Sequence, residues 1–179
     1  MATLPLYDVS IGMALNSMRS LRGILTKAQS HPDAASFATA RLHPDMFDLG
    51  FQVQTASNFC KKVVERLTGR DDLGVWADKD PRTPESAHTF DELLARVDKT
   101  IALLETVQRD AVDAAGGKTH TVTFGPVKAD CNTAQYVLGY YLPNLMFHLT
   151  TAYDILRMKG VELGKADFVK PFVADFFKP

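Results

Sequence analysis

Several features that often reveal a protein's function are missing from this sequence. No run of eighteen apolar residues occurs, so we expect no membrane-spanning helix. With 20 basic and 21 acidic residues, the chain lacks the basic excess that is typical of nucleic-acid-binding proteins. The motifs HExxH, GxSxG and GxGxxG and the P-loop are also absent. We therefore expect neither nucleic acid nor a membrane as a partner.

Cysteine is scarce as well. Cys60 and Cys131 are the two cysteines, and their spacing matches no metal-binding pattern. We expect both thiols to be free, as in a reducing compartment. Residues 1–8 lack the basic region and apolar stretch of a signal peptide, which favours a cytoplasmic location.

What the sequence does contain is ordinary globular composition, with 46% hydrophobic and 23% charged residues. A length of 179 residues suits one domain with one core, so we expect a single domain over residues 1–179. Apolar residues recur every three or four positions in four stretches, the pattern of amphipathic helices. The four predicted helices cover residues 9–30, 44–68, 89–115 and 133–159.

Local signals define the ends of these helices and the segments between them. Pro44 suits the first turn of the second helix, and Thr89 and Glu92 have the spacing of a capping box at the start of the third. Residues 70–88 are polar and predict a long crossover loop, which Leu73, Val75 and Trp76 pin to the helices. Residues 119–129 alternate about Gly125-Pro126, which predicts a small β-hairpin. The fold class predicted is all-α: an antiparallel four-helix bundle with a small β-hairpin before the last helix.

The last helix has an apolar seam formed by Leu138, Leu142, Leu145 and Leu149. Pro143 lies inside it and predicts a kink, because proline removes one backbone hydrogen bond. That bend would bring Tyr141 and Asn144 near the opening of a pocket.

Polar residues on apolar helix faces are the candidates for a functional site. His148 lies among leucines on the last helix, with Asn144 and Thr151 on the same face. Gln52 has a similar inward position on the second helix, whereas Gln54 is expected nearer solvent. Two interpretations stay open: a hydrogen-bonded core pair that fixes helix register, or a site for a ligand, a metal or proton transfer. The predicted pocket residues are Gln52, Tyr141, Asn144, His148 and Thr151.

The other histidines are His31, His43, His88 and His120. None of them has a histidine, aspartate or glutamate partner four residues away on a predicted helix, and we do not expect them to carry chemistry.

Residues 144–160 resemble the last helix of the DinB-like (DinB/YfiT) four-helix-bundle superfamily. That helix typically carries HxxxHxGQ, then a Leu-Arg pair and a glycine, and His148, Leu156, Arg157 and Gly160 stand at the matching intervals. Further short motifs resemble one domain-of-unknown-function family within that superfamily. These motifs occur in order at residues 6–8, 40–42, 45–47, 52–54, 142–144, 147–153 and 163–168.

The resemblance implies a bundle fold and, in metal-binding relatives, a site of three histidines that serves metal-dependent thiol transfer. Here Asn144 stands in place of one of these histidines, and Gln52 or Gln54 in place of another. One imidazole and two neutral amides bind a transition metal poorly. We therefore predict no metal, no other cofactor and no assigned catalytic residue.

Two hypotheses about function follow, and whether the chain is an enzyme is left open. The favoured hypothesis is a non-catalytic bundle protein that binds a small molecule or a partner through the polar pocket. The alternative is a small enzyme of the metal-dependent hydrolase or thiol-transferase type with a degenerate metal site around His148. Residues 169–179 extend beyond the family's motifs and are rich in phenylalanine, which predicts a short amphipathic helix and a homodimer.

Overall fold

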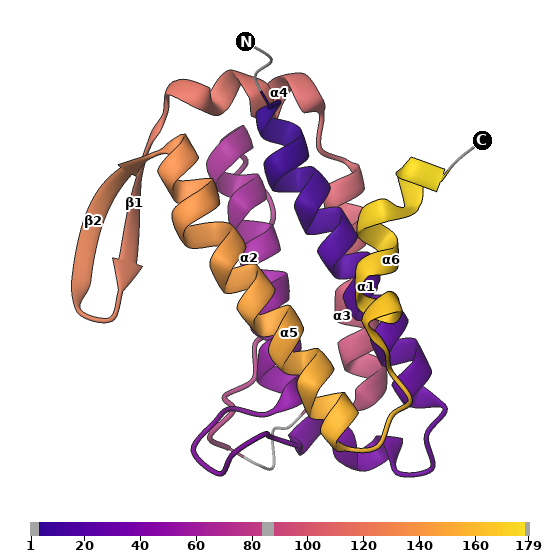
Figure 1. The fold of residues 1–179 in the computed structure, drawn as a ribbon. Helices are drawn as coiled ribbons and strands as arrows, with labels where there is room; N and C mark the ends of the chain where they lie inside the picture. The colour runs from indigo at the N-terminus through magenta and orange to yellow at the C-terminus, as the bar shows by residue number, and fades with distance from the viewer. Residues whose placement is uncertain (1–3, 84–87, 178–179) are drawn as a thin grey trace.

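The computed structural model describes residues 4–83 and 88–177. Within them the chain is mostly helical, and its strands form a two-stranded hairpin that precedes the last long helix (Figure 1). This confirms the predicted helical character and the predicted place of the hairpin. Among the described helices, none is long and apolar enough to cross a membrane.

The four longest helices lie side by side in Figure 1. Their bounds are Met13–Gln29 (α1), Leu49–Thr68 (α2), Phe90–Glu105 (α3) and Leu142–Met158 (α5). Wider π-helical turns precede α1 and α5, at Asp8–Gly12 (η1) and Gln135–Tyr141 (η5). The shorter helices are Ala34–Thr39 (η2), Arg109–Asp113 (α4), Ala114–Gly117 (η4), Lys165–Val173 (α6) and Ala174–Phe177 (η6).

The start of α2 differs from the prediction. The helix begins at Leu49, because the Asp48 carboxylate accepts a hydrogen bond from the backbone N–H of Phe51 at 2.9 Å and caps it. Pro44 lies in a turn before this cap and not in the first helical turn. The other end of α2 is closed by Gly69, whose φ of 78° suits glycine.

The third helix confirms the predicted capping box. Thr89 accepts from the backbone of Glu92, and the Glu92 carboxylate accepts from the backbone of Thr89. The helix ends at Glu105, earlier than expected. Val107 and Val112 are buried beyond it, so the chain turns inward and α4 crosses the end of the long helices (Figure 1).

The orientation of the long helices corrects the expectation of a wholly antiparallel arrangement. Gln54, near the start of α2, contacts His88 just before α3, and Arg70 after α2 donates to Thr106 after α3. Helices α2 and α3 are therefore parallel. The predicted crossover, residues 70–88, makes this possible because it returns the chain along the length of the molecule. Ion pairs from Arg19 to Glu105 and from Arg22 to Asp98 show that α1 runs antiparallel to α3.

The hairpin stands out from the helices in Figure 1. Its strands are Thr119–Phe124 (β1) and Val127–Asn132 (β2), and they pair in antiparallel register from Thr119↔Asn132 to Phe124↔Val127. Gly125 takes the positive φ of 57° that the tight turn requires. A hydrogen bond from the Tyr140 hydroxyl to the Thr123 carbonyl, at 3.1 Å, ties the hairpin to η5.

The predicted helix 133–159 runs without a break through Pro143. Its turns are π-helical up to Tyr141, and α5 continues from Leu142 with Pro143 in its first turn. The wider turns also change which residues face inward. Leu138, predicted in the apolar seam, is 58% exposed, whereas Tyr136, Val137 and Tyr141 are buried.

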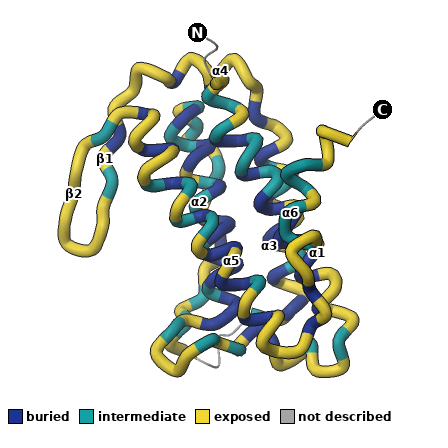
Figure 2. Tube along the Cα trace, viewed as in Figure 1, coloured by how far each residue is buried: buried dark blue, intermediate teal, exposed yellow. Residues whose placement is uncertain are grey.

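Buried residues line the sides of the long helices that face one another (Figure 2). The C-terminal helix α6 packs against α1, and Lys27 on α1 forms an ion pair with Asp167 at 2.9 Å. Phe168 and Phe172 cover this contact, with Phe168 edge-on to Tyr153. The amphipathic helix predicted for the tail is therefore present, and it begins at Lys165.

Candidate functional site

Gln52 on α2 and His148 on α5 lie in the contact between these two antiparallel helices. Oε1 of Gln52 is 2.7 Å from Nδ1 of His148, and both residues are buried. The inward position predicted for both side chains, and their proximity, are confirmed.

The hydrogen bonds of Gln52 fix the protonation of His148. Its amide nitrogen donates to the Phe47 carbonyl at 3.1 Å, because a backbone carbonyl can only accept. The amide oxygen must then face His148, so Nδ1 of the imidazole is the donor. In a neutral imidazole with a proton on Nδ1, the other nitrogen, Nε2, carries a free lone pair.

Aromatic rings surround this imidazole. Phe59 stacks on it with ring centroids 6.0 Å apart, and Phe51 and Phe147 approach edge-on at 6.0 and 5.3 Å. Burial among these rings lowers the pKa of His148 to about 4, because an apolar surrounding disfavours the charged form. The imidazole is therefore neutral near pH 7.

The remaining predicted pocket residues make their hydrogen bonds with other groups, not with this pair. Asn144 is half-buried and donates to the Tyr140 carbonyl at 2.6 Å on its own helix. Thr151 is buried and donates to the Phe147 carbonyl at 2.8 Å. Tyr141 is fully buried, with its hydroxyl 3.9 Å from the sulfur of Cys60. Burial raises the pKa of Tyr141, and it raises that of Cys60 to about 12.

The donor set does not fit the three-histidine metal site that the superfamily resemblance implies. The amide oxygen of Gln52 is engaged by His148, and that of Gln54 accepts from His88 and from the backbone N–H of Lys79. Asn144 presents its amide to its own helix. The described part of the chain holds no group of three histidine, cysteine, aspartate or glutamate side chains that could bind an ion.

A second polar cluster lies between the crossover and α3, around Gln54. Contrary to expectation Gln54 is buried, and its amide bonds both ways with the backbone of Lys79, at 2.8 and 3.2 Å. His88 Nε2 lies 2.8 Å from the same amide oxygen, and its Nδ1 lies 3.8 Å from Glu92. Burial is the main cause that lowers the pKa of His88, with the charges of Lys79 and Arg96 adding to it.

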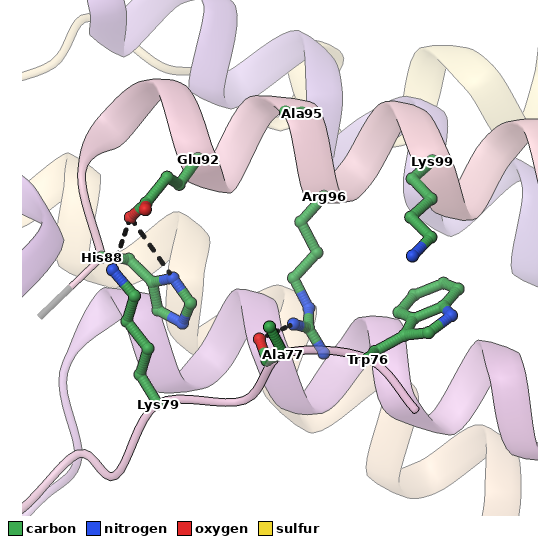
Figure 3. A pocket seen from close by; sticks show the side chains of 8 residues that line it. All are labelled: Trp76, Ala77, Lys79, His88, Glu92, Ala95, Arg96 and Lys99. Carbon is green, nitrogen blue, oxygen red and sulfur yellow. Dashed lines mark hydrogen bonds and ion pairs between the residues drawn. The ribbon is translucent and has the colours of Figure 1, made fainter. Parts of the chain in front are cut away.

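This cluster borders a cavity of about 290 Å³, which we call the Trp76 cavity (Figure 3). It is lined by Trp76, Lys79, His88, Glu92, Arg96 and Lys99, with Ala77 and Ala95 between them. Trp76 is buried, as predicted for a residue that pins the crossover, and it packs below the cations of Arg96 and Lys99. The same prediction was wrong for Val75, which is 98% exposed.

Sequence reasoning did not identify the Trp76 cavity. Helical periodicity assigns a face to Gln54 and Arg96 but does not show that the crossover folds back to cover them. Glu92 follows His88 by four residues, but His88 precedes the predicted helix, so this spacing does not by itself predict a helical pair. The structure places this pair at one end of the cavity (Figure 3).

Comparison with solved structures defines the class of protein. The chain is similar to a crystal structure of a DinB family member protein from Shewanella denitrificans, with 29% sequence identity and a TM-score of 0.75. The match covers 92% of this chain and 91% of that chain. The predicted resemblance to the DinB-like superfamily is therefore confirmed.

The particular family follows from the sequence match over residues 6–169, which corresponds to the domain of unknown function DUF1993. The chain belongs to this family. None of the functionally curated proteins matches it. The family match ends inside α6, so residues 170–179 lie beyond it.

Proposed function

We propose that this DUF1993 protein is a non-catalytic binding protein that takes an uncharged small molecule at His148. The observation that carries the proposal is the fixed, neutral imidazole, whose Nδ1 is held by Gln52 and whose Nε2 is left as a hydrogen-bond acceptor. An acceptor of this kind selects a ligand with a single O–H or N–H donor.

The surroundings of His148 select for an apolar ligand body. Phe47 and Phe147 are 42% and 58% exposed, although each is a large apolar side chain next to the buried pair. Phe47 packs at a tilt against the ring of Phe51, and Phe147 lies edge-on to the ring of His148. The two side chains thus form an aromatic rim. Apolar walls with a few fixed polar groups are typical of small-molecule sites.

Within the proposal the other predicted pocket residues support the rim. Asn144 stands one helical turn before His148 and is half-buried, so its amide oxygen is a second polar group near the ligand. Thr151 holds the carbonyl of Phe147, and Tyr141 packs in the core against Cys60.

The alternative, a small enzyme with a degenerate metal site, has less support. A general base works best when its pKa lies near the working pH, and that of His148 is lowered to about 4. The amide groups at the matched positions are engaged in other hydrogen bonds, which leaves one strong ligand for a metal.

The test uses phenol as the probe, since it combines an aromatic body with one hydrogen-bond donor. Nitrogen NMR of His148 should show a saturable shift at Nε2 on addition of phenol and little change at Nδ1. His148→Phe keeps an aromatic ring but removes the acceptor, and should weaken binding about tenfold, the equivalent of one hydrogen bond. His43→Phe, at an exposed histidine, is the matched control.

Anisole, which has the ring but no donor, separates this proposal from simple apolar binding. Anisole should bind more weakly than phenol by a similar factor. If anisole binds as tightly as phenol, or if Nε2 does not respond, the His148 site is not a hydrogen-bonding ligand site.

We further propose that the four long helices form the superfamily's bundle, with α4 and α6 added to it, and that two copies pair through α6. The exposed side of α6 and η6 carries a groove of about 600 Å³, lined by Lys165, Ala166, Val169, Lys170, Val173, Ala174 and Phe177. Phe177 is the largest side chain of this lining and lies at the end opposite Ala166. An antiparallel two-fold pairing would therefore seat Phe177 of each copy over Ala166 of its partner.

A further inference from the structure

The Trp76 cavity is separate from the His148 site and faces the opposite side of α2. It lies where the crossover passes along the first turns of α3, and Figure 3 shows its charged side chains converging from these two elements. Its volume of about 290 Å³ is at the lower end of the range for small-molecule sites. Any ligand it accepts must therefore be small.

Cationic groups outnumber carboxylates around this cavity. Lys79 pairs with Glu92 at 2.7 Å and Arg96 with Asp78 at 2.6 Å. Lys99 forms no ion pair with any residue that the structure describes, and its ammonium lies 4.7 Å from the centre of the Trp76 ring. The three cations and two carboxylates leave a net charge of +1, which favours an anion.

Arg96 is a fixed part of the site. Its side chain is 8% exposed, and it donates to the Ala77 carbonyl, to Asn58 and to Asp78 at 2.6–3.0 Å. Its Nε is buried and has no hydrogen-bond partner in the described structure. Asp78 balances the charge of Arg96, while one buried N–H donor of Arg96 is left without an acceptor among the described residues.

The rest of the lining is apolar and leaves room for a carbon skeleton. Ala77 on the crossover and Ala95 on α3 are the small side chains between the charged ends in Figure 3, and Trp76 closes one side. A hydrated inorganic anion would gain no binding free energy from these apolar surfaces. The carbon skeleton of an organic ligand would bury them, which favours binding.

We propose that the Trp76 cavity binds a small organic carboxylate, with its carboxylate paired to Lys99 and its apolar body between Ala77 and Ala95. One uncompensated cation matches a monoanion better than a phosphate dianion, which calls for additional positive groups or backbone amides. Lys99 is exposed and is therefore free to move from the Trp76 ring to the bound carboxylate.

The chain contains a single tryptophan, so its fluorescence reports directly on this cavity. Benzoate, as the probe, should change Trp76 emission saturably. Lys99→Gln should weaken benzoate about tenfold, which corresponds to the loss of one charge-assisted hydrogen bond. Lys99→Arg should retain binding, and Lys62→Gln, at an exposed lysine of α2 outside the cavity, should leave it unchanged.

Two further ligands separate charge from shape. Benzamide has the same skeleton without the charge, and should bind at least about tenfold more weakly than benzoate if the carboxylate is recognised. Inorganic phosphate should compete weakly, and phosphate competing as well as benzoate would mean a site for anions in general. Equal binding of benzamide and benzoate in the unmodified protein would overturn the proposal, as would an unchanged affinity in folded Lys99→Gln.

The outcome is independent of the proposed function at His148. His148→Phe should leave the benzoate titration of Trp76 unchanged, and Lys99→Gln should leave the phenol response of His148 unchanged. Failure at one site therefore leaves the other to be judged by its own measurement.

Discussion

Gln52 and His148 stand 96 positions apart in the chain and are joined by a hydrogen bond of 2.7 Å in the contact between α2 and α5. Because Gln52 also donates to the Phe47 carbonyl, its amide is satisfied on both sides. The pair thereby fixes the register of two long helices, whether or not a ligand uses the imidazole.

Removing one partner of this pair should destabilise the protein. His148→Ala leaves the buried amide oxygen of Gln52 without a donor, which costs about 1–3 kcal/mol. His148→Gln offers an N–H in nearly the same place and should recover part of the loss. Urea denaturation of the two variants measures the difference, and equal stability of wild type and His148→Ala would show that the bond contributes nothing.

Stability should fall as the pH drops from about 6.5 towards 4. An unfolded histidine takes up a proton near 6.5, whereas the pKa of folded His148 is about 4. The unfolded state therefore binds more protons in this window, and acidification shifts the equilibrium towards it by up to about 3 kcal/mol. The lowered pKa values of His88 and His120 act in the same direction.

The contribution of His148 to this pH dependence can be isolated with His148→Gln, which does not titrate. Thermal unfolding at a series of pH values should give a shallower decline for the variant than for the wild type. Identical slopes would mean that the imidazole is accessible to protons in the folded state.

We predict that the purified protein carries no stoichiometric transition metal. One imidazole, with Asn144 and Gln52 engaged in other hydrogen bonds, supplies too few strong ligands. Elemental analysis of protein made without an affinity tag is the measurement. About one zinc, nickel or iron per chain, lost in His148→Ala, would instead restore the enzyme hypothesis.

The proposed pairing of two copies through α6 predicts a change of size in solution. Deleting residues 170–179 should convert a dimer to a monomer in light scattering. Phe177→Glu is the milder variant, since it places a charge in the proposed contact. It leaves Phe168 and Phe172 of α6 packed against the core. Phe124→Glu, at the exposed tip of the hairpin, is the control. An unchanged mass for both α6 variants would exclude this interface.

The sequence was most informative where a residue's surroundings are set by its own helix. Apolar residues spaced three and four positions apart predicted the inward positions of Gln52 and His148. The spacing of Thr89 and Glu92 predicted the start of α3. These features depend on local geometry, which periodicity captures.

Predictions failed where distant segments decide the outcome. Gln54 is buried because the crossover returns over it, and the crossover's path is set by contacts of Asn58 and Arg96 that no spacing reveals. The π-helical turns of η5 likewise rotate Leu138 outward, since a seam counted at 3.6 residues per turn loses its phase there.

The buried contact between Cys60 and Tyr141 bears on how α2 and α5 separate. A thiol with a pKa of about 12 in a closed core presents almost no thiolate, which is the form that reacts with alkylating reagents. Alkylation of Cys60 therefore requires these helices to part, so the alkylation rate depends on how often the native molecule opens there. Cys131, half-buried on β2, lies outside that contact. Its alkylation rate therefore reports on the exposure of the hairpin and not on the separation of α2 and α5.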